Sequence, residues 1–131
     1  MTSQWHINMY EDSSGFSPFV SWYDNELDVE TQDLIQQTFD LVIEARGTGM
    51  IGSKYLKPLG DHLYQLRIKR PNQDRSDKIL IRIYLCFDFN YGVHVFSGYD
   101  KGKDDSRVRQ AAEINKARSL LTEWSKNHEP Y

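Results

Sequence analysis

The sequence predicts a single α+β domain that spans residues 1–131, with its elements in the order β-α-α-β-β-β-α. Two patterns predict this class. Segments before residue 50 and after residue 104 repeat apolar side chains at helical spacing behind capping residues, whereas residues 63–99 are rich in β-branched and aromatic side chains. The chain has 131 residues, 39% of them hydrophobic, which is enough for one core and too little for two independent ones.

The N-terminal segment predicts a strand followed by helical structure. The run WHINMY, residues 5–10, has strand-forming side chains, and the turn formers EDSSG end it. Ser17 and Pro18 mark a helix start, because a serine oxygen caps free amide groups and proline is tolerated in the first turn. Asp28 is a second cap, and apolar residues recur from there to Gly47. We therefore expect two helices, or one bent helix.

The C-terminal part predicts three strands and a closing helix. Residues 53–62 contain Pro58 and Gly60 and are expected to be irregular. The expected strands are residues 63–70, 79–87 and 93–99, with a polar loop at 71–78 and a turn at 88–92. A helix over residues 104–124 is expected to bury one apolar stripe, made of Val108, Ala111, Ala112, Ala117, Leu120, Leu121 and Trp124.

Side-chain alternation places cations on one face of two neighbouring strands. Arg67 and Lys69 share the face opposite the apolar side chains of the first strand. In the next strand Arg82 and Tyr84 lie opposite the expected core face, which consists of Ile79, Ile81, Ile83, Leu85 and Phe87. An arginine inside an apolar strand is costly unless a carboxylate, carbonyl groups or a bound phosphate satisfy it. Two interpretations stay open: a buried ion pair with an N-terminal carboxylate, or a phosphate site.

Charge is distributed unevenly along the chain. The formal net charge is -3, yet residues 1–50 hold nine carboxylates and one cation, whereas residues 51–131 hold ten carboxylates and fifteen cations. A local excess of lysine and arginine suits a polyanionic ligand. The alternative is a solvated surface whose charges compensate one another within the molecule.

The composition argues against several classes of protein. The single cysteine, Cys86, can build neither a disulfide framework nor a thiolate metal cluster, and the four histidines lack metal-ligand spacing, so we expect no metal and no cofactor. The first residues do not have the pattern of a signal peptide, and no stretch approaches the roughly 18 apolar residues of a membrane span. We therefore expect a soluble cytoplasmic protein with no membrane partner.

Four segments in order resemble a known family. They are YLKPLGDHLYQLRIK from residue 55, ILIRIYLCF from residue 79, VHVFSGYDKGK from residue 93 and EINKAR from residue 113. Together they are similar to the lysine-containing loop, the three strands and the closing helix of RelE/ParE-superfamily toxins, in particular the HigB-like, phage-related branch of type II toxin-antitoxin systems. The resemblance covers roughly residues 54–118, and it is carried by the ordered set, because no single segment is specific.

The resemblance implies a RelE-like fold: a small antiparallel sheet packed by two N-terminal helices and one C-terminal helix. It also implies an mRNA interferase, an endoribonuclease that cleaves messenger RNA on the ribosome and inhibits translation, neutralised by a helix-turn-helix antitoxin. The family's phosphate-handling arginines fall on Arg67 and Arg82, and its lysine after the last strand falls on Lys101. Other residues expected to bind RNA are Lys54, Lys57, Lys69, Tyr84, Tyr99 and Lys103.

These residue types suit metal-free cleavage of RNA. The 2′-hydroxyl attacks the neighbouring phosphate, so the protein must stabilise a dianionic phosphorane and help to move two protons. Arginine suits the first task, because its planar fork matches two phosphate oxygens. Lys54, Lys57 or Lys101 can serve as a base only if nearby cations depress its pKa, and Tyr84 or Tyr99 can stack a base or handle a proton.

An alternative from another class is a non-catalytic adaptor of the same fold that binds RNA or a protein. Two features motivate it: the acidic N-terminal segment, and Gly102, which stands where the resembled family has the second lysine of a pair.

Overall fold

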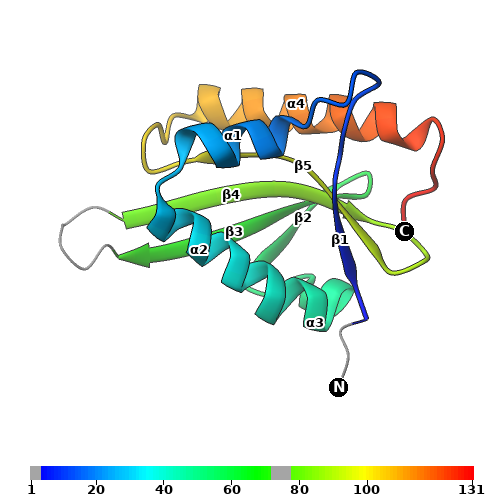
Figure 1. Ribbon diagram of the computed structural model, residues 1–131, viewed down its shortest axis with the longest axis horizontal. Coiled ribbons are helices and arrows are strands. Elements are labelled where there is room, and N and C mark those ends of the chain that lie inside the picture. Colours follow the sequence, from blue (N-terminus) through cyan, green and yellow to red (C-terminus); the bar gives the residue numbers. More distant parts are fainter. Residues whose placement is uncertain (1–3, 72–77) are drawn as a thin grey trace.

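The fold is described from a computed structural model that describes residues 4–71 and 78–131, and Figure 1 shows its arrangement. Its elements in chain order are β1 (His6–Met9), α1 (Pro18–Glu26), α2 (Val29–Thr38), a π-helical turn (Phe39–Ile43), α3 (Glu44–Arg46), a 3-10 turn (Gly47–Met50), β2 (Leu56–Gly60), β3 (Leu63–Pro71), β4 (Lys78–Phe87), β5 (Gly92–Asp100) and α4 (Arg107–Ser125). The chain is thus an α+β domain, and most of the polar loop expected at 71–78 lies outside the described residues.

The five strands form one mixed sheet in the order β1-β5-β4-β3-β2. Strands β2 to β5 are antiparallel to their neighbours, whereas β1 runs parallel to β5. The sheet is therefore not wholly antiparallel, because β1 forms one edge beside the parallel β5, and the helices connect β1 to β2 at the opposite edge. Strand β2 occupies a segment expected to be irregular. Pro58 is compatible with it because β2 is an edge strand, where a missing backbone N–H leaves no partner unsatisfied.

Helices cover both faces of the sheet. On one face α1, α2 and the π-helical turn pack on the inward residues of β3, β4 and β5, and Ile35, Phe39 and Ile43 are buried there. On the other face α4 packs on a second cluster that includes Tyr84, Cys86 and Phe96. Strand β4 is thus buried on both faces, as its continuous apolar sequence predicts. Ile79 was also expected on the core face of this strand, but its side chain is not among those that the structure describes.

The predicted helix starts are confirmed. Ser17 Oγ accepts a hydrogen bond from the Val20 N–H at 3.3 Å, and Asp28 Oδ1 accepts one from the Thr31 N–H at 2.8 Å. Of the two alternatives, two helices or one bent helix, the structure has separate helices on either side of Asp28. The first, α1, ends before Asp28, and the helical segment that begins with α2 continues through the π-helical turn to Arg46. Gly47 ends this segment with φ +48, and a Cβ there would collide with the Trp5 indole.

The expected apolar stripe of α4 is only half correct. Ala117, Leu121 and Trp124 are buried, and Leu120 is partly buried. Val108, at 81% exposure, and Ala111 and Ala112 face solvent instead. The N-terminal turns of α4 therefore meet the sheet through polar side chains, which an apolar periodicity cannot reveal. No helix within residues 4–71 and 78–131 is long and apolar enough to cross a membrane.

Candidate anion-binding site

Strand register brings the two predicted arginines side by side. Arg67 of β3 lies directly opposite Arg82 of β4, which in turn lies opposite Tyr99 of β5. Directly opposed residues of antiparallel strands project from the same face, so these three side chains form one row on the α4 face of the sheet. The next row on that face contains Gln65, Tyr84 and Ser97.

Neither guanidinium has a carboxylate partner. Arg67 Nη2 donates to the Ser53 carbonyl at 3.4 Å, and Arg82 Nη1 donates to the Ile81 carbonyl at 3.3 Å. The Nε atoms of both arginines are buried without a hydrogen-bond partner, and no ion pair among the described residues involves either side chain. The expected alternative, a buried ion pair between these arginines and an N-terminal carboxylate, is therefore wrong for the described residues.

The electrostatics of the pair are unfavourable in the free protein. Burial lowers the pKa of Arg82 from its ordinary value, and the positive charge of Arg67 lowers it further. An arginine nevertheless keeps its charge at any physiological pH, so the two cations remain opposed on a partly buried surface. An anion bound between them would supply the compensating charge and acceptors for the unused N–H groups.

The arginines open into a cationic pocket of about 390 Å³, lined by Lys54, Tyr55, Arg67, Lys69 and Arg82. The bend before β2 carries two of these side chains, Lys54 and Tyr55, and it is held against β3 because the Arg67 N–H donates to the Tyr55 carbonyl at 2.7 Å. Lys54 Nζ lies 5.2 Å from the centre of the Tyr55 ring. Four cations and one aromatic ring, with no carboxylate among the described lining residues, suit a phosphate that carries an attached organic group.

Three other predicted lysines lie outside this lining. Lys57 is exposed on β2 opposite Gln65, in line with the second row of the sheet. Lys101 follows β5 and is half-buried, with its N–H donating to the Leu80 carbonyl at 2.7 Å. Lys103 is exposed in the turn after β5. These lysines add positive charge around the sheet end and the β2 edge without lining the pocket itself.

The two predicted tyrosines lie beneath the protein surface. Tyr84 and Tyr99 are both fully buried, with nearly parallel rings whose centres are 6.4 Å apart. Burial raises the pKa of both hydroxyls, which are close enough to influence each other's pKa. In this arrangement neither ring has a free face on which a nucleobase can stack.

Several site residues were missed by sequence reasoning. Tyr55 lines the pocket, and Gln65 and Ser97 are buried polar residues of the second row. From α4, Glu113 is 8% exposed and its Oε2 lies 3.7 Å from Arg109 Nε, and the Arg109 guanidinium lies 5.3 Å from the centre of the Tyr99 ring. Alternation in β3 contained a signal for Gln65, whereas the places of Tyr55 and Glu113 depend on contacts between distant segments.

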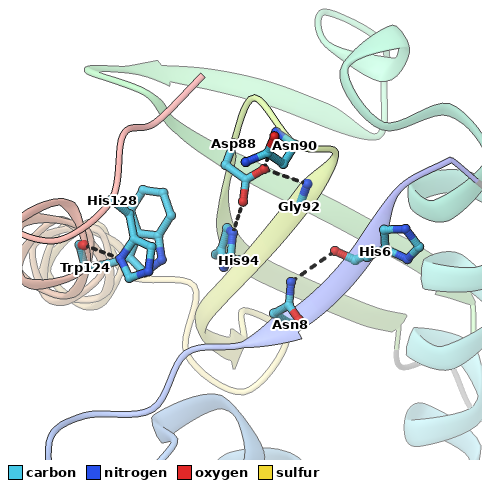
Figure 2. Close-up of polar contacts among 8 residues, drawn as sticks. All are labelled: His6, Asn8, Asp88, Asn90, Gly92, His94, Trp124 and His128. Carbon is cyan, nitrogen blue, oxygen red and sulfur yellow. Dashed lines mark hydrogen bonds and ion pairs between the residues drawn. The ribbon is translucent and has the colours of Figure 1, made fainter.

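A separate polar cluster lies at the other end of β5 (Figure 2). His94 Nε2 lies 2.6 Å from Asp88 Oδ2, and the Trp124 indole packs against the rings of both His94 and His128, with each ring centre 4.7 Å from that of the indole. His94, Trp124 and His128 border a pocket of about 400 Å³ that is also lined by Glu11 and Glu123. No group of three or more metal-ligating side chains was found among the described residues.

The comparisons with known proteins assign no family. The sequence matches no model of a known protein family, and no curated protein is significantly similar to it. The function is therefore inferred from the chemistry of the site.

Proposed function

We propose that this protein is an RNA-cleaving toxin of the RelE/HigB kind, which acts on messenger RNA at the ribosome and inhibits translation. The observation that carries the proposal is the opposed pair Arg67 and Arg82, whose buried Nε atoms lack partners at the floor of a pocket with four cations. The proposal includes a helix-turn-helix antitoxin as the partner that neutralises the protein, and the cytoplasm as the place where it meets ribosomes.

The proposed reaction needs no metal. Arg67 and Arg82 bind the scissile phosphate and stabilise the two negative charges of the phosphorane as the 2′-hydroxyl attacks. Lys54 and Lys69 line the same pocket and are the nearest candidates for proton transfer, together with the Tyr55 hydroxyl. Lys101 supplies charge from the turn after β5, beside the row that contains Arg82.

Alanine substitution of either arginine tests the proposal. Arg67→Ala and Arg82→Ala are each expected to lower the rate of ribosome-dependent mRNA cleavage by about 100-fold or more, because each removes a preorganised charge from the transition state. Growth inhibition on expression is expected to disappear in parallel. The measurements are primer extension on mRNA from a translation reaction and growth curves after induction.

The matched control is Lys116→Ala, which removes an exposed cation of α4 that does not line the cationic pocket. This variant should cleave and inhibit growth as the wild type does. Circular dichroism of every variant separates loss of activity from loss of folding. Equal activity of the wild type and both arginine variants would overturn the proposal.

The second candidate is an adaptor that binds RNA or a protein and does not cleave. It is favoured by the described part of the pocket lining, which contains neither histidine nor carboxylate to take the proton of the 2′-hydroxyl. An adaptor would still bind RNA through Arg67 and Arg82. Binding that is lost in the arginine variants, together with no cleavage by the folded wild type at any concentration, would select the adaptor.

A further inference from the structure

A second groove adjoins the cationic pocket, on the face of the sheet that α1 and α2 cover. It measures about 230 Å³, and its lining includes Leu34, Gln37, Leu41 and Val42 of the α2 segment. Tyr55 and Lys69 line both this groove and the cationic pocket, so they form the wall that the two share. The two pockets therefore meet at Tyr55 and Lys69, beside the position of a ligand held by the arginines.

The chemistry of the groove differs from that of the pocket. Leu41 is 74% exposed, and Leu34, Val42 and Tyr55 are partly buried side chains packed against the core. The exposed amide of Gln37 has no hydrogen bond to another described residue, and it offers both a donor and an acceptor. Apolar walls with one adaptable amide suit a flat, uncharged heterocycle that carries polar groups on its edge.

We propose that this groove binds the nucleobase next to the phosphate that Arg67 and Arg82 hold. Tyr55 packs against the base, Leu41 covers it and the Gln37 amide contacts its edge. The inference rests on the proposed function only in taking the bound phosphate to belong to single-stranded RNA, and it does not depend on cleavage. It makes Tyr55 and Leu41 determinants of which oligonucleotides bind.

The test compares two uncleavable probes, a short 2′-O-methyl-oligouridine and the same oligomer without its bases. The wild type is expected to bind the first about tenfold more tightly at low salt, since stacking and apolar cover strengthen binding of each base by roughly that factor or more. Leu41→Ser should lose this preference and keep the affinity for the baseless oligomer. Tyr55→Leu should also lose the preference. Fluorescence anisotropy measures both affinities.

The matched control is Val108→Ser, which shortens an exposed apolar side chain on α4 and should leave the preference unchanged. Arg67→Ala should weaken both probes together, because it acts on the phosphate. Equal binding of the two probes by the wild type, a preference that survives in Tyr55→Leu, or no binding of either probe would each overturn the inference. Failure of mRNA cleavage, with the base preference intact, would overturn only the proposed catalytic function.

Discussion

At the scale of single residues, Arg67 and Arg82 stand out because the free protein leaves them uncompensated. Buried N–H groups without partners and two opposed like charges both cost folding free energy. The apolar layers on both sides of β4 must offset that cost. A side-chain arrangement that is unfavourable without a ligand and complementary to an anion is typical of a binding site rather than of a structural ion pair.

Asp88, in contrast to the two arginines, has partners for both of its carboxylate oxygens. Its Oδ1 accepts from the Asn90 N–H at 2.7 Å and the Gly92 N–H at 2.8 Å, and its Oδ2 lies 2.6 Å from His94 Nε2. Burial alone would raise the pKa of Asp88, but these contacts outweigh burial and hold the pKa below its ordinary value. The ionised carboxylate therefore secures the turn between β4 and β5.

Replacing Asp88 with asparagine should make this contribution visible. Asp88→Asn is expected to lower the free energy of unfolding at neutral pH by about 1–3 kcal/mol, the usual contribution of hydrogen bonds to a charged group. Because the pKa is lower in the folded state, the stabilisation is present above the unfolded pKa of about 4 and is lost as pH falls through the folded value. Urea unfolding at a series of pH values measures it.

The control for this prediction is Asp105→Asn, which neutralises an exposed carboxylate after the last strand. Its difference in unfolding free energy from the wild type should be small at every pH. The prediction for Asp88 fails if Asp88→Asn differs from the wild type by the same amount at pH 7 as at pH 2.

At the scale of elements, the contact between α1 and β5 limits how the sheet is covered. Trp22 of α1 lies against Gly98 of β5, and a Cβ at position 98 would come within 2.6 Å of the indole ring. Gly98 lies opposite Ile83 of β4, which is buried in the core between the sheet and the helices α1 and α2. The absence of a side chain at Gly98 therefore lets the largest aromatic residue of α1 approach the sheet backbone.

Adding a methyl group at this contact should destabilise the protein. Gly98→Ala is expected to lower the unfolding free energy by about 1–3 kcal/mol, because the indole must move within a packed core. Gly49→Ala is the matched control, since a Cβ there meets nothing within 4 Å, and it should change stability by about 0.5 kcal/mol or less. Thermal or urea unfolding measures both variants, and equal effects would contradict the packing argument.

At the scale of the whole molecule, the asymmetry of charge along the sequence becomes an asymmetry of surfaces. The cationic pocket draws all its lining from the segment after residue 50, which holds fifteen of the sixteen lysines and arginines. The pocket beside His94 is lined by the carboxylates Glu11, Asp12 and Glu123 and by no lysine or arginine. A net charge of -3 therefore coexists with a local site for a polyanion.

RNA binding should consequently depend on salt through a small number of contacts. With the four cations of the pocket engaged, a plot of log affinity against log salt concentration for a single-stranded RNA should have a slope near -3. Lys69→Ala should make the slope shallower by about 0.7, because one phosphate contact is lost. Lys116→Ala should not change it. A slope near zero, or one that is unaffected by Lys69→Ala, would contradict binding through this pocket.

The α+β class, the helix starts at Ser17 and Asp28 and the faces of the two strands that carry Arg67 and Arg82 followed from local sequence alone. Capping at Ser17 and Asp28 and alternation around Arg67 and Arg82 depend on neighbouring residues, so they could be predicted without knowledge of contacts. The resemblance to RelE-like toxins pointed to the same arginines. The function that it implies remains a proposal, to be decided by the cleavage measurements.

Only the tertiary structure decided which residues meet. The parallel pairing of β1 with β5, the added strand β2 and the position of Arg67 directly opposite Arg82 depend on strand pairings between segments far apart in sequence. The same is true of Tyr55, which lines both the pocket and the groove because residues of α2 and β3 converge on it. Local sequence thus determined the sheet face on which Arg67 and Arg82 lie. Nonlocal packing determined which residues they meet there, because the free energy of strand pairing is gained only when distant segments come together.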